Sequence, residues 1–285
     1  MTVQKRNDEM VRLLSADFPT RYDWQSNPAL MLSALQTMHR AYDGTSGIGG
    51  ALMYAWLGDR TAIDSFVGSQ ALTAPSVGYD DFGITANGAP YVDLDGFTEV
   101  LYVADAAWQE PGAEELFVWH WCQTTTVAAS QTVASKYDTN ANNCAWRLWY
   151  NSASSSFEMV CNATGNAAND ITASLTYTEA INTWYFVAGY YNPSTLMRVF
   201  VGAATDSTLT VGSQTVGVPA TLYDGTAPLG LGTAFNSAPT LLAPWNGLLS
   251  IGGARMNVGT GTATAYAEVN AYASRLFQMT RWFYQ

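Results

Sequence analysis

Small groups of aspartates are the first residues of this chain that could do chemistry. They stand at Asp80, Asp81, Asp93, Asp95 and Asp138, each group close to a glycine or an asparagine. Carboxylate oxygens are the ligands that calcium prefers, so these aspartates are candidates for a calcium site at the rim of the fold. Aspartates in such positions also stabilise turns by accepting backbone hydrogen bonds, and the sequence leaves both roles open.

The other carboxylates lack the spacing that glycoside hydrolysis requires. That reaction needs two acidic side chains facing one groove. Glu158 stands alone, and the adjacent Glu114 and Glu115 would point to opposite faces of a strand. Asp93 and Asp95 are two residues apart but border a glycine turn. We therefore expect no hydrolase, and Glu158 is the residue on which a hydrolase would depend.

The two histidines do not indicate a catalytic base. His39 and His120 are far apart in sequence, and His120 lies between Trp119 and Trp121 in an apolar run, as expected of a hydrogen-bonded core residue. The chain has no Gly-x-Ser-x-Gly sequence, no P-loop and no Cys-x-x-Cys spacing. We expect a protein that is not an enzyme and has no cofactor, with calcium the one ion left open.

Aromatic residues make up 13% of the chain, and some of them could stack on sugar rings. Aromatic side chains commonly line ligand sites, but in a two-sheet fold most of them fill the core. Both roles stay open for each candidate. The candidates lie in or near expected loops, or on strand faces that could be exposed: Trp108, Trp149, Tyr190, Tyr191 and Tyr223.

Charge and composition narrow the choice of partners. Hydrophobic residues make up 48% of the 285 residues, enough for a sizeable core, whereas charged residues make up only 12% against about 25% in ordinary soluble domains. The net charge is −11 and the only lysines are Lys5 and Lys136. Because phosphate contact relies on basic side chains, nucleic acid and anionic membranes are poor partners.

The N-terminal residues and the cysteines give information about the cellular compartment of the protein. No apolar signal core follows the N-terminal residues 1–9, and no run of 18 apolar residues could span a membrane. Cys122 and Cys161 sit in apolar strand-like runs, where buried free thiols are expected. With Cys144 they make an odd number, and one disulfide stays open.

The hydrophobic period divides the chain at a glycine-rich break over residues 43–50. Residues 1–45 have helical spacing, with a second helix expected at 27–38, whose Asn27 and Pro28 suit a helix start. We expect an N-terminal helical segment at 1–45 and a β domain at 46–285. The spacing predicts a short helix over the last twenty residues, ending in an aromatic terminus that closes the core or docks on a partner.

From residue 51 the period becomes two, which predicts an all-β fold of two packed antiparallel sheets. Residues 116–122 are apolar on both faces and should form a central strand that is covered on each side. The predicted strands are 51–57, 90–94, 99–104, 116–123, 131–137, 145–151, 156–162, 171–177, 183–191, 196–202, 208–216, 228–232 and 246–251.

Several short motifs, in order and spacing over residues 51–252, resemble laminin G-like domains, which fold as concanavalin A-like jelly rolls. QTVASKYD at 131–138 resembles the family's Q-x-I-x-S-K-Y-D strand, and PWNG at 244–247 its closing P-F-N-G. Further resemblances lie at 54–73, 95–103, 115–122, 146–148, 182–191 and 229–232. The resemblance implies a two-sheet jelly roll that recognises or displays and rarely catalyses.

The sequence departs from the family where the family often binds calcium. After Asn246-Gly247 the family continues with two acids, but residues 248–255 read LLSIGGAR and contain neither. The family's D-G-V-L-V hairpin is replaced by VGAAT at 201–205. These losses weaken the case for an inherited metal site.

These observations favour a non-catalytic structural or adhesive protein, docked to a larger assembly through residues 1–45. An extracellular type of module without a secretion signal, with low charge and free cysteines, fits a bacteriophage virion protein such as a capsid-decoration, fibre or tail component. Homo-oligomers and other virion proteins are the expected partners, with no nucleic acid and no membrane insertion. The alternative is an extracellular, lectin-like module that binds a cell-surface glycan, and a glycoside hydrolase is the third.

Overall fold

The computed structural model describes residues 51–54, 65–67, 73, 74, 76, 77, 79–87, 89–106, 109, 111–236, 240–256 and 263–285. The predicted N-terminal helical segment at 1–45, and with it the proposed domain boundary, lies outside the described residues. No helix of the described part combines the length and apolarity needed to cross a membrane.

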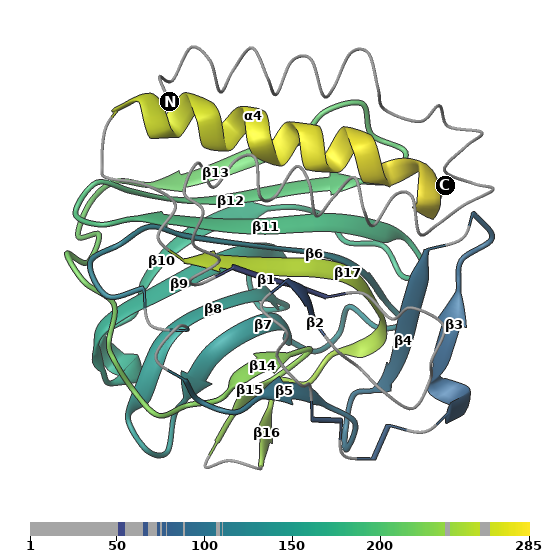
Figure 1. Cartoon of the computed structure of the whole chain (residues 1–285), viewed down its shortest axis with the longest axis horizontal. Helices are drawn as coiled ribbons and strands as arrows, with labels where there is room; N and C mark the ends of the chain where they lie inside the picture. Colours follow the sequence, from purple (N-terminus) through teal and green to yellow (C-terminus); the bar gives the residue numbers. More distant parts are fainter. Residues whose placement is uncertain are drawn as a thin grey trace.

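Two sheets carry the fold, and we call them sheet I and sheet II (Figure 1). Within the described residues sheet I has nine strands, ordered β13-β12-β11-β6-β17-β1-β2, with β4 paired to β17 and β3 to β4. Their bounds are β1 (Ala51–Tyr54), β2 (Ser65–Val67), β3 (Phe82–Ile84), β4 (Pro90–Asp95), β6 (Leu116–Thr124), β11 (Trp184–Asn192), β12 (Leu196–Ala203), β13 (Thr210–Gln214) and β17 (Asn246–Met256).

Sheet II has the order β10-β9-β8-β7-β14-β5, and the short β15 and β16 join it beside β7. The strand pairs are antiparallel, apart from one parallel contact of β15 with β7. The bounds are β5 (Leu101–Val103), β7 (Gln131–Asp138), β8 (Asn143–Asn151), β9 (Ser156–Gly165), β10 (Ile171–Thr176), β14 (Leu229–Leu231), β15 (Ala234–Phe235) and β16 (Leu241–Leu242).

The main core lies between the two sheets, and β6 shows how it is built. Leu116, Val118 and Cys122 of this strand belong to the inter-sheet cluster. Trp119 and Trp121 alternate with them and belong to a second cluster on the other face of sheet I. The prediction of a central strand covered on both faces is therefore confirmed, because alternate side chains of a strand point to opposite faces.

The second cluster is covered by the C-terminal helix α4 (Ala263–Thr280), which lies along sheet I on the side away from sheet II (Figure 1). Trp121 Nε1 donates a hydrogen bond to Thr280 Oγ1 at 2.7 Å. A 3₁₀ turn, η4 (Arg281–Tyr284), follows, and Phe283 and Tyr284 are buried. The predicted C-terminal helix is confirmed, and the aromatic terminus closes onto sheet I of its own chain.

The observed strands confirm a two-sheet antiparallel jelly-roll sandwich with a short C-terminal helix. Each predicted strand has an observed counterpart, with ends that differ by a few residues. The predictions missed β2, β3, β15 and β16, which have three residues or fewer. Such short strands carry too few alternating residues to show a period.

The expected core roles of the cysteines and of His120 are also observed. Cys122, Cys144 and Cys161 are buried free thiols. His120 is fully buried on β6 and donates a hydrogen bond to the Ser250 backbone carbonyl. Burial lowers the pKa of His120 to about 3, so the imidazole is neutral at ordinary pH.

Candidate functional site

The face of sheet II that points away from the core carries an unusual pair of side chains on β8. Trp146, Leu148 and Tyr150 point into the inter-sheet core. Arg147 and Trp149 alternate with them and so lie on the outer face of the same strand. This alternation gives β8 one apolar face and one face that carries a basic and an aromatic side chain.

The Arg147 guanidinium is held between aromatic rings instead of ion pairs. Its Cζ lies 3.7 Å from the ring centroid of Trp149 and 4.7 Å from that of Tyr137. The residue is only 8% exposed, and burial lowers its pKa from the ordinary value. Among the described residues, Arg147 forms no ion pair and its Nε has no hydrogen-bond partner.

A second donor on this face is also unmatched. The indole Nε1 of Trp149 is buried and has no acceptor within the described part of the chain. A buried donor without a partner costs roughly 1–3 kcal/mol of stability, so two neighbouring cases call for an explanation. Both donor atoms have almost no accessible surface, because neighbouring side chains cover them.

Glu158 supplies an acceptor directly beside these donors. It lies on β9 opposite Trp149 in the strand register. Its Oε1 accepts hydrogen bonds from Asn151 Nδ2 at 3.1 Å, Ser154 Oγ at 3.1 Å and Ser156 Oγ at 2.9 Å. These donors fix the carboxylate in place, and no hydrogen bond occupies its Oε2 in the described structure.

A second carboxylate comes from the connection between β9 and β10, which contains the 3₁₀ turn η3 (Ala167–Asn169). Asp170 Oδ2 accepts a hydrogen bond from the Tyr137 hydroxyl at 2.5 Å, and its Oδ1 accepts one from Asn162 Nδ2 at 2.7 Å. Desolvation and the neighbouring Asp170 raise the pKa of Tyr137 well above its ordinary value. Tyr137 therefore stays a neutral donor, and Asp170 is anchored next to the guanidinium.

Tyr223, one of the predicted sugar-stacking residues, lies beside Gly165, the last residue of β9. It is half-buried, and its backbone N–H donates to the Asn162 carbonyl at 2.8 Å. A Cβ at Gly165 would come within 2.8 Å of its ring. The outer face of sheet II thus has Trp149 and Arg147 on β8 and Tyr223 against the far end of β9.

We call Tyr137, Arg147, Trp149, Glu158 and Asp170 the Arg147 cluster.

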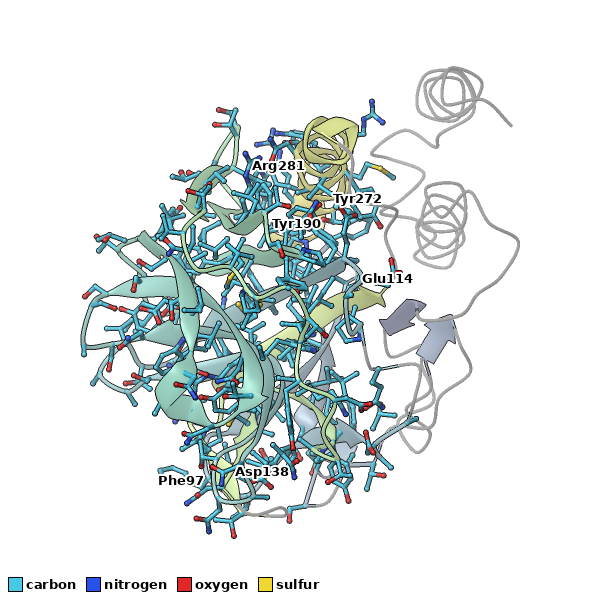
Figure 2. The ribbon with its side chains drawn as sticks, turned by 90° about the vertical axis from the view of Figure 1, so that its left-hand side faces the viewer. Phe97, Glu114, Asp138, Tyr190, Tyr272 and Arg281 are labelled. Carbon is cyan, nitrogen blue, oxygen red and sulfur yellow. The ribbon has the colours of Figure 1, made fainter. Side chains whose placement is uncertain are left out.

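Two other aromatic candidates, Tyr190 and Tyr191, do not join this cluster. Tyr190 is fully buried and donates to Glu115 Oε1 at 2.9 Å, and Figure 2 shows it beside Tyr272 beneath α4, far from Asp138. Tyr191 is fully buried in the inter-sheet core. As predicted ligand contacts these two are wrong, because both rings are consumed by packing. Trp108 lies outside the described residues.

The aspartates predicted to bind calcium are divided between the sheets. Burial and the negative charge of Asp81 together raise the pKa of Asp93, so these two aspartates lie close enough to interact. Glu99 belongs to the same acidic group, because burial and the charge of Asp81 also raise its pKa. Glu99 was not among the residues predicted to bind calcium. Asp80 is exposed in the 3₁₀ turn η1 (Tyr79–Asp81), beside Asp81.

Two of these aspartates stabilise turns. Asp95 Oδ1 accepts the backbone N–H groups of Phe97, Thr98 and Glu99, and these bonds outweigh burial and lower the pKa of Asp95 to about 2. Asp138, on β7, accepts the Asn140 N–H. No group of three or more His, Cys, Asp or Glu side chains within the described ranges is placed to hold a metal ion. Calcium binding stays a prediction.

Sequence reasoning named Trp149 and Tyr223 as candidates and did not name Arg147, Tyr137 or Asp170. The alternation on β8 was a usable signal for Arg147, because it places that residue on the same face as Trp149. Asp170 gave no signal, since its position depends on how the β9–β10 connection folds back over the sheet.

Comparisons with known proteins support the fold. No protein family and no curated protein sequence matches the chain. Among solved structures, it is similar to the botulinum neurotoxin serotype G binding domain, with a TM-score of 0.54 and 10% identity over 80% of this chain and 50% of that one.

Two further solved structures show the same level of similarity. The binding domain of Paraclostridial Mosquitocidal Protein 1 has a TM-score of 0.51 and 10% identity, over 81% of this chain and 52% of that one. A botulinum neurotoxin type C structure, described as needing two ganglioside molecules for cell entry, has a TM-score of 0.51 and 11% identity, over 80% and 52%. The chain spans about half the length of these proteins. At such identities the likeness establishes a shared sandwich fold.

Proposed function

We propose that this chain is a non-catalytic, adhesive module that binds carbohydrate through the Arg147 cluster on the outer face of sheet II. The observation that carries the proposal is the half-buried indole of Trp149, which lies on the outer face of sheet II against the Arg147 guanidinium. Sugar hydroxyls are neutral acceptors and donors at once, so they can satisfy such a face without burying a new charge.

Two further observations support a binding role. The structural neighbours include a botulinum neurotoxin type C whose cell entry depends on interaction with two ganglioside molecules. The cluster is also rigid, because Glu158 and Asp170 each receive more than one hydrogen bond from the protein. Preorganised polar groups lose little entropy on binding, which favours recognition of small polar ligands.

A finer proposal concerns where the module acts. We infer from the sequence that it belongs to a bacteriophage virion, docked through residues 1–45 and displayed as a homo-oligomer. The support is the low share of charged residues, 12%, and the three free cysteines. A virion adhesin could bind a host glycan through such a module, so the two proposals are compatible.

The test of glycan binding uses the full-length chain on a broad glycan panel, with and without calcium. We expect binding to a subset of glycans, lost in Trp149→Ala and kept in Phe97→Ala. Phe97 is the control, since this aromatic residue is 77% exposed on the connection between β4 and β5. Thermal unfolding of both variants checks that the fold survives.

Flat binding across the panel in both conditions would refute the carbohydrate proposal. Binding that survives Trp149→Ala would move the site away from the Arg147 cluster. The hydrolase alternative is tested separately by incubating the bound glycans with the protein. We expect no turnover, and turnover that disappears in Glu158→Gln would show an enzyme instead.

A further inference from the structure

Exposed hydrophobic side chains gather at one end of the sandwich. The part of the chain that the structure describes has five large hydrophobic residues that are exposed: Phe97, Val127, Ile181, Val211 and Val216. The first three lie on the β4–β5, β6–β7 and β10–β11 connections. Single exposed hydrophobic residues are ordinary, but a group of them on neighbouring loops is typical of a surface that binds another molecule.

Asn246, the first residue of β17, brings two of these connections together. It lies opposite Asp95 in the strand register, and Asp95 is two residues before Phe97. The Asn246 backbone carbonyl also accepts the Thr125 N–H at 3.0 Å, and Thr125 is two residues before Val127. The β4–β5 and β6–β7 connections therefore lie on either side of one residue.

Ile181 belongs to the same group. The next residue, Asn182, donates its backbone N–H to the Thr124 carbonyl at 2.9 Å. Thr124 is the last residue of β6, where the connection that carries Val127 begins. We call Phe97, Val127 and Ile181 the apolar rim.

Hydrogen bonds fix the connections that carry the apolar rim. Asp95 Oδ1 accepts the Phe97 backbone N–H at 2.7 Å, which holds the β4–β5 turn. Gln131 Nε2 donates to Thr124 Oγ1 at 2.8 Å and to the Thr126 carbonyl at 2.6 Å, so it ties both ends of the β6–β7 connection together. Side chains presented on fixed turns lose little entropy when a partner binds.

The apolar rim is bordered by acids and lacks basic residues. Asp93 and Asp95 are exposed and precede Phe97 on the same strand and turn. Residues 61–135 and 148–197, which include all three connections, contain no lysine or arginine. The local field is therefore negative, and the net charge of −11 adds to it.

We propose that the apolar rim docks a segment of a partner protein that combines hydrophobic and basic side chains, a role beyond the proposed carbohydrate binding. The hydrophobic side chains of the partner cover Phe97 and Ile181, and its basic side chains lie against Asp93 and Asp95. Burial of apolar surface supplies affinity, and complementary charge selects the partner. Anionic partners meet like charge here and are repelled.

The experiment titrates the full chain with three synthetic peptides of equal length and follows backbone amide signals in two-dimensional ¹⁵N NMR spectra. One peptide alternates leucine with lysine, the second replaces leucine by serine, and the third replaces lysine by glutamate. We expect the leucine and lysine peptide to shift the amide signals of the apolar rim at concentrations where the other two leave them unmoved. Higher ionic strength should weaken this binding, because salt screens exposed charges.

Single substitutions locate the site. Phe97→Ser and Ile181→Ser should each weaken binding of the leucine and lysine peptide by about tenfold, because each removes an apolar side chain that the partner buries. Asp93→Asn should weaken both the binding and its salt dependence. Trp149→Ala should leave peptide binding unchanged, which separates this surface from the carbohydrate site. Thermal unfolding checks that each variant is folded.

Val216→Ser is the matched control. Val216 is 76% exposed, close to the 77% of Phe97. It follows Gln214 of β13, which the strand register places at the Leu116 end of β6, away from the Thr124 end that carries the apolar rim. This variant should bind the peptide as the unchanged chain does.

Three results would overturn the proposal. Peptide binding that survives both Phe97→Ser and Ile181→Ser would show a general attraction to an acidic chain instead of docking at the rim. Equal binding of the glutamate peptide would remove the charge requirement. Phosphatidylcholine vesicles are the third probe: vesicle binding that is lost in Phe97→Ser, with no binding of any peptide, would show a lipid-binding surface.

Discussion

The ring of Tyr284 stacks on that of Trp121, with centroids 4.3 Å apart and planes at 20°. This contact joins the C-terminal 3₁₀ turn to the central strand of sheet I. The Tyr284 hydroxyl also lies 2.8 Å from Ser250 Oγ, on β17. The C-terminal aromatic residues are therefore part of the core of this sheet.

The first prediction concerns this contact. Tyr284→Ala should lower the free energy of unfolding by about 3 kcal/mol, because it removes a buried ring from a packed cluster. Tyr284→Phe keeps the ring and should cost about 1 kcal/mol for the lost hydrogen bond. Urea denaturation measures both, with Phe97→Ala as the control. Equal stability of Tyr284→Ala and the unchanged chain would contradict the role of this turn in the fold.

The second prediction concerns the ion pair of Lys136 and Asp105, whose atoms Nζ and Oδ1 lie 2.6 Å apart. The Lys136 side chain is fully buried, whereas that of Asp105 is 36% exposed. Asp105→Asn leaves a buried ammonium without its carboxylate and should cost roughly 2 kcal/mol, less than for a fully buried pair because of solvent screening.

Lys136→Met is the matched variant for that pair. It leaves only a half-exposed carboxylate and replaces a buried charge by an apolar chain, so it should be less destabilising than Asp105→Asn. Thermal and urea unfolding give the order of the two variants. The reverse order would show that the lysine stabilises the fold by more than its pairing with Asp105.

The third prediction is a fall in stability with rising pH, caused by Glu179. This residue is 6% exposed, and neither carboxylate oxygen has a hydrogen-bond partner within the described residues. Burial raises the pKa of Glu179 from 4.5 to about 8. The folded state therefore binds more protons than the unfolded state in this window, and stability should fall by up to about 1.4 kcal/mol per pH unit.

Glu179→Gln tests the assignment because it cannot ionise. The fall between pH 4.5 and about 8 should disappear in this variant. His120 acts in the opposite direction at lower pH, since its depressed pKa of about 3 makes stability rise with pH up to about 6.5. The clearest comparison is therefore made between pH 6.5 and about 8, where the contribution of His120 has ended. An unchanged slope in Glu179→Gln would reject the prediction.

The fourth prediction compares two glycines that both have a positive φ. Gly165 has φ +78°, and a Cβ there would lie 2.1 Å from the Asn142 carbonyl oxygen; Gly112 has φ +56° and nothing within 4 Å of its Cβ position. Gly112→Ala should cost roughly 1 kcal/mol for backbone strain alone. Gly165→Ala should cost more in thermal unfolding, and it should also weaken glycan binding, because it displaces the backbone next to Asn162 and Tyr223.

The fifth prediction concerns assembly. If residues 1–45 anchor the protein, light scattering should show an oligomer for the full chain and a folded monomer for a chain that begins at residue 46. Circular dichroism provides the folding control. Two monomers would contradict the anchoring role and leave the carbohydrate proposal unaffected.

The sequence alone was sufficient to place most of the strands along the chain and to predict the two-sheet architecture. Period-two alternation is a local property, and β6, β8 and β11 each have nine residues in which to show it. The alternation on β8 also assigned Trp149 to one face of its strand. For Glu179, by contrast, the composition of the 177–183 connection contains no sign of burial, because that burial arises from the packing of the loop as a whole.

Only the tertiary structure decided which polar and aromatic residues meet. Tyr190 and Tyr191 looked as suitable for a ligand as Trp149, but α4 and sheet II cover them. Arg147, Glu158 and Asp170 come together because the antiparallel register sets β9 beside β8 and the β9–β10 connection folds back over both. Local sequence patterns determine strands and their faces, whereas contacts between distant residues depend on register and loop closure, which such patterns do not encode.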